Sequence, residues 1–263
     1  MKEIKIVFDD ADGYERYMGR WSRAIGEKFL AWVAPPHNAR WLDVGCGTGA
    51  FSELIQQRQS PRSLSGIDPS AAQIDYARLK LPKADLRVAD SMALPFVDGT
   101  FDVVASALVL HFMPDRAKAL AEMKRVTCGG GIVSSYTWER TQTDNFAPYA
   151  PMLRAIEKIG VEPMRSPTVP EANLEGLQAA IEAAGFDDIA VSRIEASQSF
   201  RDFDDYWETQ TLPVSPPGKS VAKLDDNQRA RLRAILRETL PIAKDGSITY
   251  SSRAVAFKAH KAG

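Results

Sequence analysis

Short apolar runs alternate with segments of helical periodicity through the first half of the chain. Apolar runs with the length and composition of buried strands lie at 40–44, 64–67, 84–88, 101–108 and 130–136. Amphipathic helical patterns lie at 14–33, 50–59, 70–80 and 113–126. Strands and helices that alternate at this spacing predict a parallel sheet with helices on both of its faces.

The second half of the chain has longer helical patterns and two strand-like segments. Helical patterns lie at 148–160, 174–184, 203–211 and 225–242, and alternating patterns typical of strands lie at 186–199 and 248–258. The prolines and glycine between 213 and 218 predict a loop that separates the last two helices. We expect one domain over 1–263, with a cofactor-binding core at 37–138 and helical cap inserts at 140–170 and 200–245.

The composition is that of an ordinary globular protein. The chain has 263 residues, of which 44% are hydrophobic and 25% are charged, and its formal net charge is −1. Basic residues concentrate only in 229–237, where their spacing distributes them around a helix and predicts a solvated surface. We therefore expect no nucleic acid partner and no attraction to an anionic membrane.

Neither a membrane span nor a metal site is expected. No apolar run approaches the roughly 18 residues that a span requires, and the first residues lack the pattern of a signal peptide. Cys46 and Cys128 are the two cysteines, and they do not have the spacing of metal ligands. These observations predict a cytoplasmic protein.

A glycine-rich turn follows the first predicted strand and opens the next helix. Residues 45–50 have the sequence GCGTGA, and its glycines let the backbone approach a ligand closely. The helix that follows offers unpaired N–H groups and the positive end of its dipole. The turn also fits the dinucleotide fingerprint G-x-G-x-x-A, so its glycines leave two cofactors open, NAD and S-adenosylmethionine.

Asp43 stands two residues before the first glycine and favours the second of these cofactors. A carboxylate here would lie near the pyrophosphate of a dinucleotide, and like charges about 4 Å apart repel each other by about 1 kcal/mol even in water. S-adenosylmethionine instead carries an ammonium group and a sulfonium, which a carboxylate attracts. The alternative is that Asp43 braces the turn by accepting hydrogen bonds from its N–H groups.

Asp68 ends the second predicted strand, roughly twenty residues after the glycine turn. An acid at this distance can accept hydrogen bonds from both hydroxyls of a ribose. Taken alone, an aspartate before a proline such as Pro69 is more typical of a turn or a helix cap. The distance from the glycine turn favours the ribose role.

Together these motifs resemble those of the class I S-adenosylmethionine-dependent methyltransferases, in the broad group that includes ubiquinone and menaquinone C-methyltransferases and small-molecule methyltransferases. Residues 42–49, LDVGCGTG, match the first motif of that group, and residues 66–70, GIDPS, resemble its ribose motif. Residues 89–102 resemble its third and fourth motifs. The resemblance implies a Rossmann-like α/β fold with a seven-stranded, mostly parallel sheet, in which the last strand is antiparallel and lies next to the sixth.

The resemblance also implies roles for individual residues. Asp90 would bond the adenine amino group, and the backbone of Ser91 would meet the adenine ring. The segment before the first strand would fold over the cofactor, where Tyr14 or Arg20 would reach its carboxylate. Cys46 is expected to pack within the turn and not to act as a nucleophile. The expected cofactor-binding residues are Tyr14, Arg20, Asp43, Gly45, Cys46, Gly47, Asp68, Pro69, Asp90, Ser91 and Leu108.

The activity that the resemblance implies is transfer of a methyl group from S-adenosylmethionine to a small-molecule or lipid-like acceptor. The product would be S-adenosylhomocysteine, no metal would be needed, and the protein would be a monomer or a homodimer. Two alternatives stay open: an NAD-dependent oxidoreductase, and a protein that binds S-adenosylmethionine without catalysis or that modifies a protein or RNA. The sequence leaves open whether carbon, nitrogen or oxygen is methylated.

Candidates for the acceptor side follow the predicted strands at their carboxyl ends, where open α/β sheets bind ligands. His111 follows the fourth strand and is the candidate catalytic residue, although it can equally pack against the following helix. A base is needed only if the nucleophile must lose a proton. Candidates for an apolar substrate pocket, each of which can also belong to the core, are Trp138, Phe146, Tyr149 and Tyr206.

Overall fold

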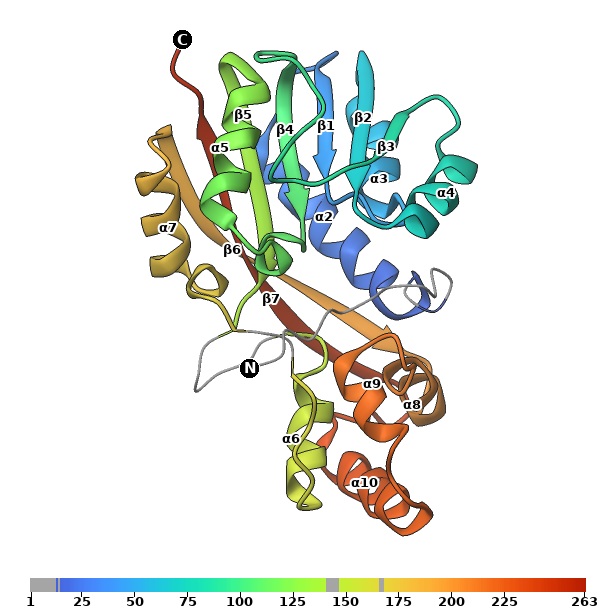
Figure 1. The fold of residues 1–263 in the computed structure, drawn as a ribbon. Coiled ribbons are helices and arrows are strands. Elements are labelled where there is room, and N and C mark those ends of the chain that lie inside the picture. The colour runs from blue at the N-terminus through green and yellow to red at the C-terminus, as the bar shows by residue number, and fades with distance from the viewer. Residues whose placement is uncertain (1–12, 14, 141–146, 166–167) are drawn as a thin grey trace.

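Seven strands form one sheet in the computed structural model, which describes residues 13, 15–140, 147–165 and 168–263 (Figure 1). The strands are β1 (Arg40–Val44), β2 (Ser63–Asp68), β3 (Asp85–Val88), β4 (Phe101–Ala107), β5 (Thr127–Trp138), β6 (Asp187–Phe200) and β7 (Ile248–His260). Their order is β3-β2-β1-β4-β5-β7-β6. The first five strands are parallel, and β7 is antiparallel to both of its neighbours, β5 and β6. The predicted sheet, with its antiparallel last strand next to the sixth, is confirmed.

Helices cover both faces of the sheet (Figure 1). The helices are α2 (Arg20–Val33), α3 (Ala50–Gln59), α4 (Ala71–Lys80), α5 (Arg116–Val126), α6 (Ala150–Lys158), α7 (Leu174–Ala183), α8 (Phe203–Gln210), α9 (Pro216–Val221) and α10 (Asp226–Thr239). Short turns of other helix types are η1 (Glu15–Gly19), η2 (Leu110–Phe112) and η3 (Pro170–Ala172).

The central strands are apolar on both sides because each side meets a different pair of helices. Trp41 of β1 lies in a hydrophobic cluster with residues of α2 and α3. Its neighbours Leu42 and Val44 lie in the opposite cluster, with residues of α5 and α7. Successive side chains of a strand point to opposite faces, so a strand buried on both faces is a continuous apolar run, as the sequence pattern indicates.

A second group of helices packs around the far ends of β6 and β7. In Figure 1 these two strands extend beyond the carboxyl ends of the parallel strands, where α6, α8, α9 and α10 surround them. The group has its own core, formed by Met152, Ala155, Ile156, Ile159, Phe200, Phe203, Tyr206, Val221, Leu224, Leu232, Leu236, Leu240 and Ile248. These helices come from the segments expected to form cap inserts. The division of the chain into a core and inserts stays a prediction.

The prolines at 213–218 predict a loop in the segment where the structure has α9. Pro216 and Pro217 occupy the first turn of this helix, where a proline is tolerated because its missing N–H would have no partner in the helix. The side chain of Ser215 caps the helix by accepting a hydrogen bond from the N–H of Gly218 at 3.0 Å. A proline-rich segment, which usually indicates a loop, therefore begins a helix in this protein.

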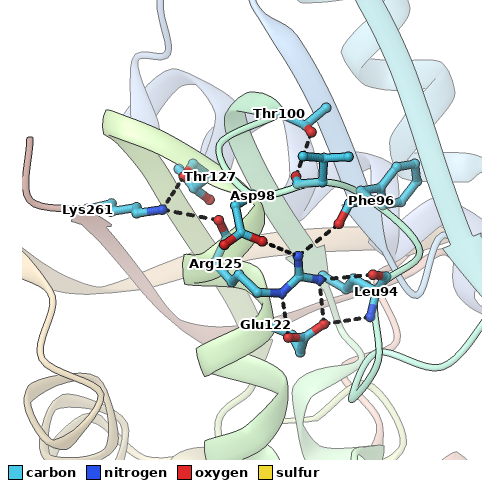
Figure 2. A network of polar contacts seen from close by, with 9 residues as sticks. Leu94, Phe96, Asp98, Thr100, Glu122, Arg125, Thr127 and Lys261 are labelled. Atoms are coloured by element: carbon cyan, nitrogen blue, oxygen red, sulfur yellow. Dashed lines mark hydrogen bonds and ion pairs between the residues drawn. The ribbon is translucent and has the colours of Figure 1, made fainter.

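The loop before β4 is fixed by an arginine of α5, as Figure 2 shows. The guanidinium of Arg125 donates to the carbonyls of Leu94 and Phe96 at 3.0 and 2.8 Å and pairs with Glu122 at 2.7 Å. Glu122 in turn accepts from the N–H of Leu94 at 2.8 Å. This network fixes the loop between β3 and β4. The same loop contains Asp90 and Ser91, the residues expected to bind adenine.

Within the described part of the chain, no helix combines the length and the apolar character that crossing a membrane requires. The longest helices, α2 and α10, have 14 residues each. A bilayer core about 30 Å thick needs about 20 residues of helix.

Candidate functional site

The glycine turn lies at the carboxyl end of β1, in the position that the sequence predicts. The N–H groups of Gly45 and Cys46 donate to the carbonyl of Ile67 at 2.8 and 2.9 Å, which ties the turn to β2. Gly45 has a φ of +78°, and a Cβ there would lie 2.5 Å from Cγ1 of Val109. Only a glycine fits both this backbone and this contact. The chain then enters α3, whose first N–H groups are directed to the same edge of the sheet.

Asp43 lies beneath the turn and is fully buried. Its Oδ2 accepts a hydrogen bond from Oγ of Ser52 at 2.6 Å, while no described residue hydrogen-bonds its Oδ1. Burial, helped by the negative charge of Asp68 and opposed by the Ser52 hydrogen bond, raises the pKa of Asp43 to about 7. A buried carboxylate with an open oxygen is a site for a cation or a hydrogen-bond donor.

Asp68, at the end of β2, braces the turn. Its Oδ2 accepts from the N–H of Gly47 at 3.1 Å, and its Oδ1 accepts from the N–H of Ser70 at 2.9 Å. Burial raises the pKa of Asp68 in spite of these two hydrogen bonds. The bracing role that the sequence analysis considered for Asp43 therefore belongs to Asp68. Each carboxylate oxygen has a second lone pair, so Asp68 can still accept from a ribose.

Four more residues of the expected cofactor set, Pro69, Asp90, Ser91 and Leu108, follow the carboxyl ends of β2, β3 and β4. Asp90 is exposed, and its Oδ1 accepts from the N–H of Met92 at 2.8 Å. Pro69 is exposed beside Asp68, and Ser91 is half-buried. Leu108, directly after β4, has a φ of +62°, a strained backbone for a leucine, and donates its N–H to the carbonyl of Tyr136 at 2.8 Å. Such strain is concentrated at functional sites in proteins.

Cys46 packs inside the molecule. It is 6% exposed and lies in a cluster with Ile74, Ala77, Leu81 and Leu86. Burial, with the nearby charges of Asp43 and Asp68, raises the pKa of its thiol well above the usual value. A thiol held in its protonated form is a poor nucleophile, which agrees with the packing role expected for it.

These residues fit S-adenosylmethionine. The cofactor has two cationic groups and a ribose, and the site offers two buried carboxylates on either side of a turn with no room for a side chain at Gly45. Asp43 and Asp68 would hold the cationic and ribose parts, and Asp90 with Ser91 would hold the base. A pyrophosphate in the same place would meet two carboxylates in surroundings of low dielectric, which is unfavourable.

His111 lies in η2, after the carboxyl end of β4. It is 6% exposed, and its Nδ1 lies 2.7 Å from Oγ1 of Thr137 on β5. Burial, together with the positive charges of Arg140 and Arg116, holds the pKa of His111 well below its usual range. The imidazole is therefore neutral at physiological pH and a weak base, oriented by Thr137.

Arg140 was missed by the sequence analysis. It follows β5 and is 2% exposed. Its Nη1 donates to the hydroxyl of Tyr149 at 3.2 Å, and its backbone N–H donates to the carbonyl of Ala172 at 2.7 Å. The available signal was its position, because a charged residue directly after a buried strand lies at the edge where ligands bind. Tyr149, expected in an apolar pocket, thus lies against a guanidinium at the start of α6.

Three other expected residues make contacts elsewhere. Trp138 belongs to the main core, where its ring meets Trp21 edge-on at 6.1 Å between centroids. Tyr206 is fully buried in the core of the second helical group. Arg20 is half exposed and pairs with Asp205 of α8 at 3.6 Å. Tyr14 and Phe146 lie outside the described residues.

Among the residues that the structure describes, no three histidine, cysteine or acidic side chains are grouped in a way that could hold a metal ion. The two cysteines are both free thiols.

Comparison with known proteins agrees with the geometry of the site. Residues 42–135 match the family model described as a methyltransferase domain. Over these residues the chain is similar to methyltransferase domains. The matched segment contains the glycine turn, both buried carboxylates, Asp90 and His111, so the match covers the cofactor side of the site and ends before the end of β5.

Curated relatives cover more of the chain. Over 164 residues the chain is 30% identical to a malonyl-[acyl-carrier protein] O-methyltransferase of Pectobacterium atrosepticum, covering 56% of this chain and 64% of the relative. Over 104 residues it is 41% identical to a demethylmenaquinone methyltransferase of Lactiplantibacillus plantarum, covering 37% of this chain and 44% of the relative. The chain thus spans less than two thirds of the length of either relative.

Solved structures share the fold at low identity. A phosphoethanolamine N-methyltransferase 2 of Haemonchus contortus, in complex with S-adenosyl-L-methionine, aligns with a TM-score of 0.60 and 16% sequence identity. The alignment covers 99% of this chain and 59% of that structure. At this identity the likeness establishes the fold alone, which is Rossmann-like.

Proposed function

We propose that this protein transfers a methyl group from S-adenosylmethionine to a small-molecule or lipid-like acceptor and releases S-adenosylhomocysteine. The observation that carries the proposal is the pair of buried carboxylates, Asp43 and Asp68, on either side of the glycine turn. When bound, S-adenosylmethionine supplies a methyl group that is already activated by its attachment to a sulfonium. The domain match and the methyltransferase relatives support the same activity.

The residues of the chain mainly hold and orient the reactants. Asp43 attracts the cationic part of the cofactor, and Asp68 holds both the glycine turn and the ribose. Asp90 and Ser91 determine where the adenine lies. In-line displacement requires the acceptor atom to stay aligned with the methyl group, and such positioning supplies a large part of the rate enhancement in enzymes of this kind.

The acceptor side of the site needs no strong base. His111 is neutral and has a depressed pKa, so it orients a ligand through a hydrogen bond more readily than it removes a proton. Thr137 holds one ring nitrogen and leaves the other for a contact at the edge of the sheet. An acceptor that is already nucleophilic at physiological pH suits these surroundings.

The two alternative functions have weaker support. An NAD-dependent oxidoreductase would place a pyrophosphate between Asp43 and Asp68, against their charges. A protein that binds the cofactor without catalysis does not need His111 and Arg140 buried at the carboxyl ends of β4 and β5, where the acceptor would bind. A monomer or homodimer that works in the cytoplasm without nucleic acid remains our expectation.

Calorimetric titration of the purified chain separates these functions. We expect S-adenosylmethionine and S-adenosylhomocysteine to bind with one site per chain, and NAD to produce no heat of binding. Tight binding of NAD, with no response to either sulfur compound, would overturn the proposal. A screen of a metabolite library for formation of S-adenosylhomocysteine then distinguishes an enzyme from a protein that only binds the cofactor.

A further inference from the structure

Arg140 has a buried guanidinium with one edge unused. The residue is 2% exposed, and Nη1 is the nitrogen that donates to Tyr149. Nε and Nη2 are buried and have no hydrogen-bond partner among the described residues. These two groups lie side by side on one edge of the planar guanidinium, where two parallel N–H bonds can be donated to a single ligand.

No described acidic side chain is available to neutralise this charge. Glu139, its neighbour in sequence, is buried and pairs with Arg193 at 2.7 Å and with Arg253 at 2.9 Å. Glu171 pairs with Arg116 at 2.9 Å. A buried charge without an anion is costly, and proteins retain one where a ligand supplies the counter-charge.

The guanidinium is held in place and lies at the carboxyl end of the sheet, where the acceptor would bind. The backbone N–H of Arg140 is bonded to Ala172, and Tyr149 holds Nη1 at the start of α6. After burial, the positive charge of Arg140 contributes to the lowered pKa of the His111 imidazole. Arg140 follows β5 and His111 follows the adjacent strand β4, so the positive guanidinium and the neutral imidazole lie at the same end of the sheet.

We propose that the acceptor of this methyltransferase carries a carboxylate, and that the Nε–Nη2 edge of Arg140 binds it. This inference rests on the proposed function, and it adds the chemical class of the acceptor. A planar carboxylate has two oxygens at the spacing of the two free N–H groups, so both can be satisfied at once. A lysine would offer only a point charge.

Binding of small acids to the protein saturated with S-adenosylhomocysteine tests the inference. The probes are octanoate and succinate, with octanamide as the neutral match and inorganic phosphate as the non-carboxylate anion. The two acids distinguish an acyl chain from a short diacid as the source of the carboxylate. We expect at least one acid to bind, and octanamide and phosphate to bind at least tenfold more weakly than that acid.

Variants of Arg140 separate binding from folding. Arg140→Gln should lower the affinity for the acid at least tenfold, and Arg140→Lys should lower it less. The affinity of both variants for S-adenosylhomocysteine should be within twofold of that of the wild type. The matched control is Arg201→Gln, because the Arg201 side chain is 82% exposed. Since Arg140→Gln removes an unneutralised charge, its melting temperature should equal or exceed that of the wild type.

Several results would overturn the inference. These are equal binding of octanoate and octanamide, binding of phosphate alone, failure of both acids to bind, unchanged acid affinity in Arg140→Gln, or marked unfolding of Arg140→Gln and Arg140→Lys alike. Failure of S-adenosylhomocysteine to bind would instead count against the proposed function. Acid binding is then measured without it, so the two failures are distinguishable.

Discussion

The carboxylate of Asp68 accepts a hydrogen bond from the backbone N–H of Gly47 at 3.1 Å. This contact joins the end of β2 to the turn after β1, and its partners are separated by 21 residues in the chain. One side chain therefore shapes the turn and also offers its remaining lone pairs to a ligand. Turn geometry and cofactor affinity should depend on the same residue.

Asp68→Ala should weaken binding of S-adenosylhomocysteine at least tenfold, because it removes the brace of the turn together with a ribose acceptor. A tenfold change corresponds to about 1.4 kcal/mol. Calorimetric titration gives the affinity. The matched control is Asp75→Ala, an exposed aspartate on α4, which should bind as the wild type does. Equal affinities for the two variants would contradict the role of Asp68.

The affinity for S-adenosylmethionine should rise with pH up to about 7 because of Asp43. Below its pKa of about 7, Asp43 is mostly protonated, and a cationic ligand must displace that proton. The affinity should therefore increase up to about tenfold per pH unit between pH 5.5 and 6.5 and level off near pH 7. Titration at several pH values measures this slope.

Asp43→Asn is the control for the pH dependence. It keeps the shape of the side chain and cannot ionise, so its affinity for S-adenosylmethionine should be weak and nearly independent of pH.

The raised pKa of Asp43 should also make the stability of the fold depend on pH, in the direction opposite to that of the affinity. The folded chain binds the proton more tightly than the unfolded chain, so this group should lower stability as pH rises from about 4 to 7. Denaturant titrations of both proteins check the sign, and identical pH slopes would argue against it.

Gly45→Ala should lower both stability and cofactor affinity. The new Cβ would combine a left-handed backbone with a 2.5 Å contact to Val109. Gly246→Ala is the matched control, because Gly246 has a φ of +88° and open space around it. The control should lose only about 1–2 kcal/mol, the usual cost of a side chain in this conformation, and Gly45→Ala should lose more.

A double variant isolates the contact with Val109. Val109→Ala on the Gly45→Ala background should recover part of the lost free energy of unfolding, since it removes the two methyl groups at 2.5 and 2.8 Å from the new Cβ and leaves only Cβ of Val109, at 3.0 Å. A double-mutant cycle from denaturant titrations gives this coupling. Strictly additive losses would show that the contact does not account for the effect.

Arg125→Met should loosen the loop before β4. The variant loses hydrogen bonds to two carbonyls and to Glu122 (Figure 2), and we expect a loss of about 2 kcal/mol in the free energy of unfolding. Asp98→Asn removes only an exposed partner of the same guanidinium and should cost less than about 1 kcal/mol. Similar losses of unfolding free energy in both variants would show that the ion pair between Arg125 and Asp98, and not the bonds to the carbonyls, supplies the stabilisation.

The sequence alone was sufficient for most of the fold. β1 and α3 lie where the apolar runs and the glycine turn predict them, and α4, which Ser70 caps, lies within the helical pattern at 70–80. These features depend on neighbours within one turn or one strand, which the sequence shows directly. The last strand was placed by resemblance, because its pattern says only that it is a strand and not which strands it pairs with.

The site was predictable in its residue types but not in its division of roles. Asp43 and Asp68 were both identified from their spacing to the glycines. Whether either one braces the turn depends on how β1 and β2 are registered, and the structure gives that role to Asp68. The helix α9 shows the same limit, because the same prolines can end one helix or begin another.

By itself, the sequence determined the alternating strands and helices of the first half, the cofactor turn and the acids beside it, because these follow from local periodicity and short spacings. Only the tertiary structure decided which charges are buried without a partner. In the sequence Arg140 is an ordinary charged residue after a strand. Folding brings Tyr149 and Ala172 against it from later segments, removes it from water and leaves one edge of its guanidinium open. Burial is a property of the whole fold, and no local pattern records it.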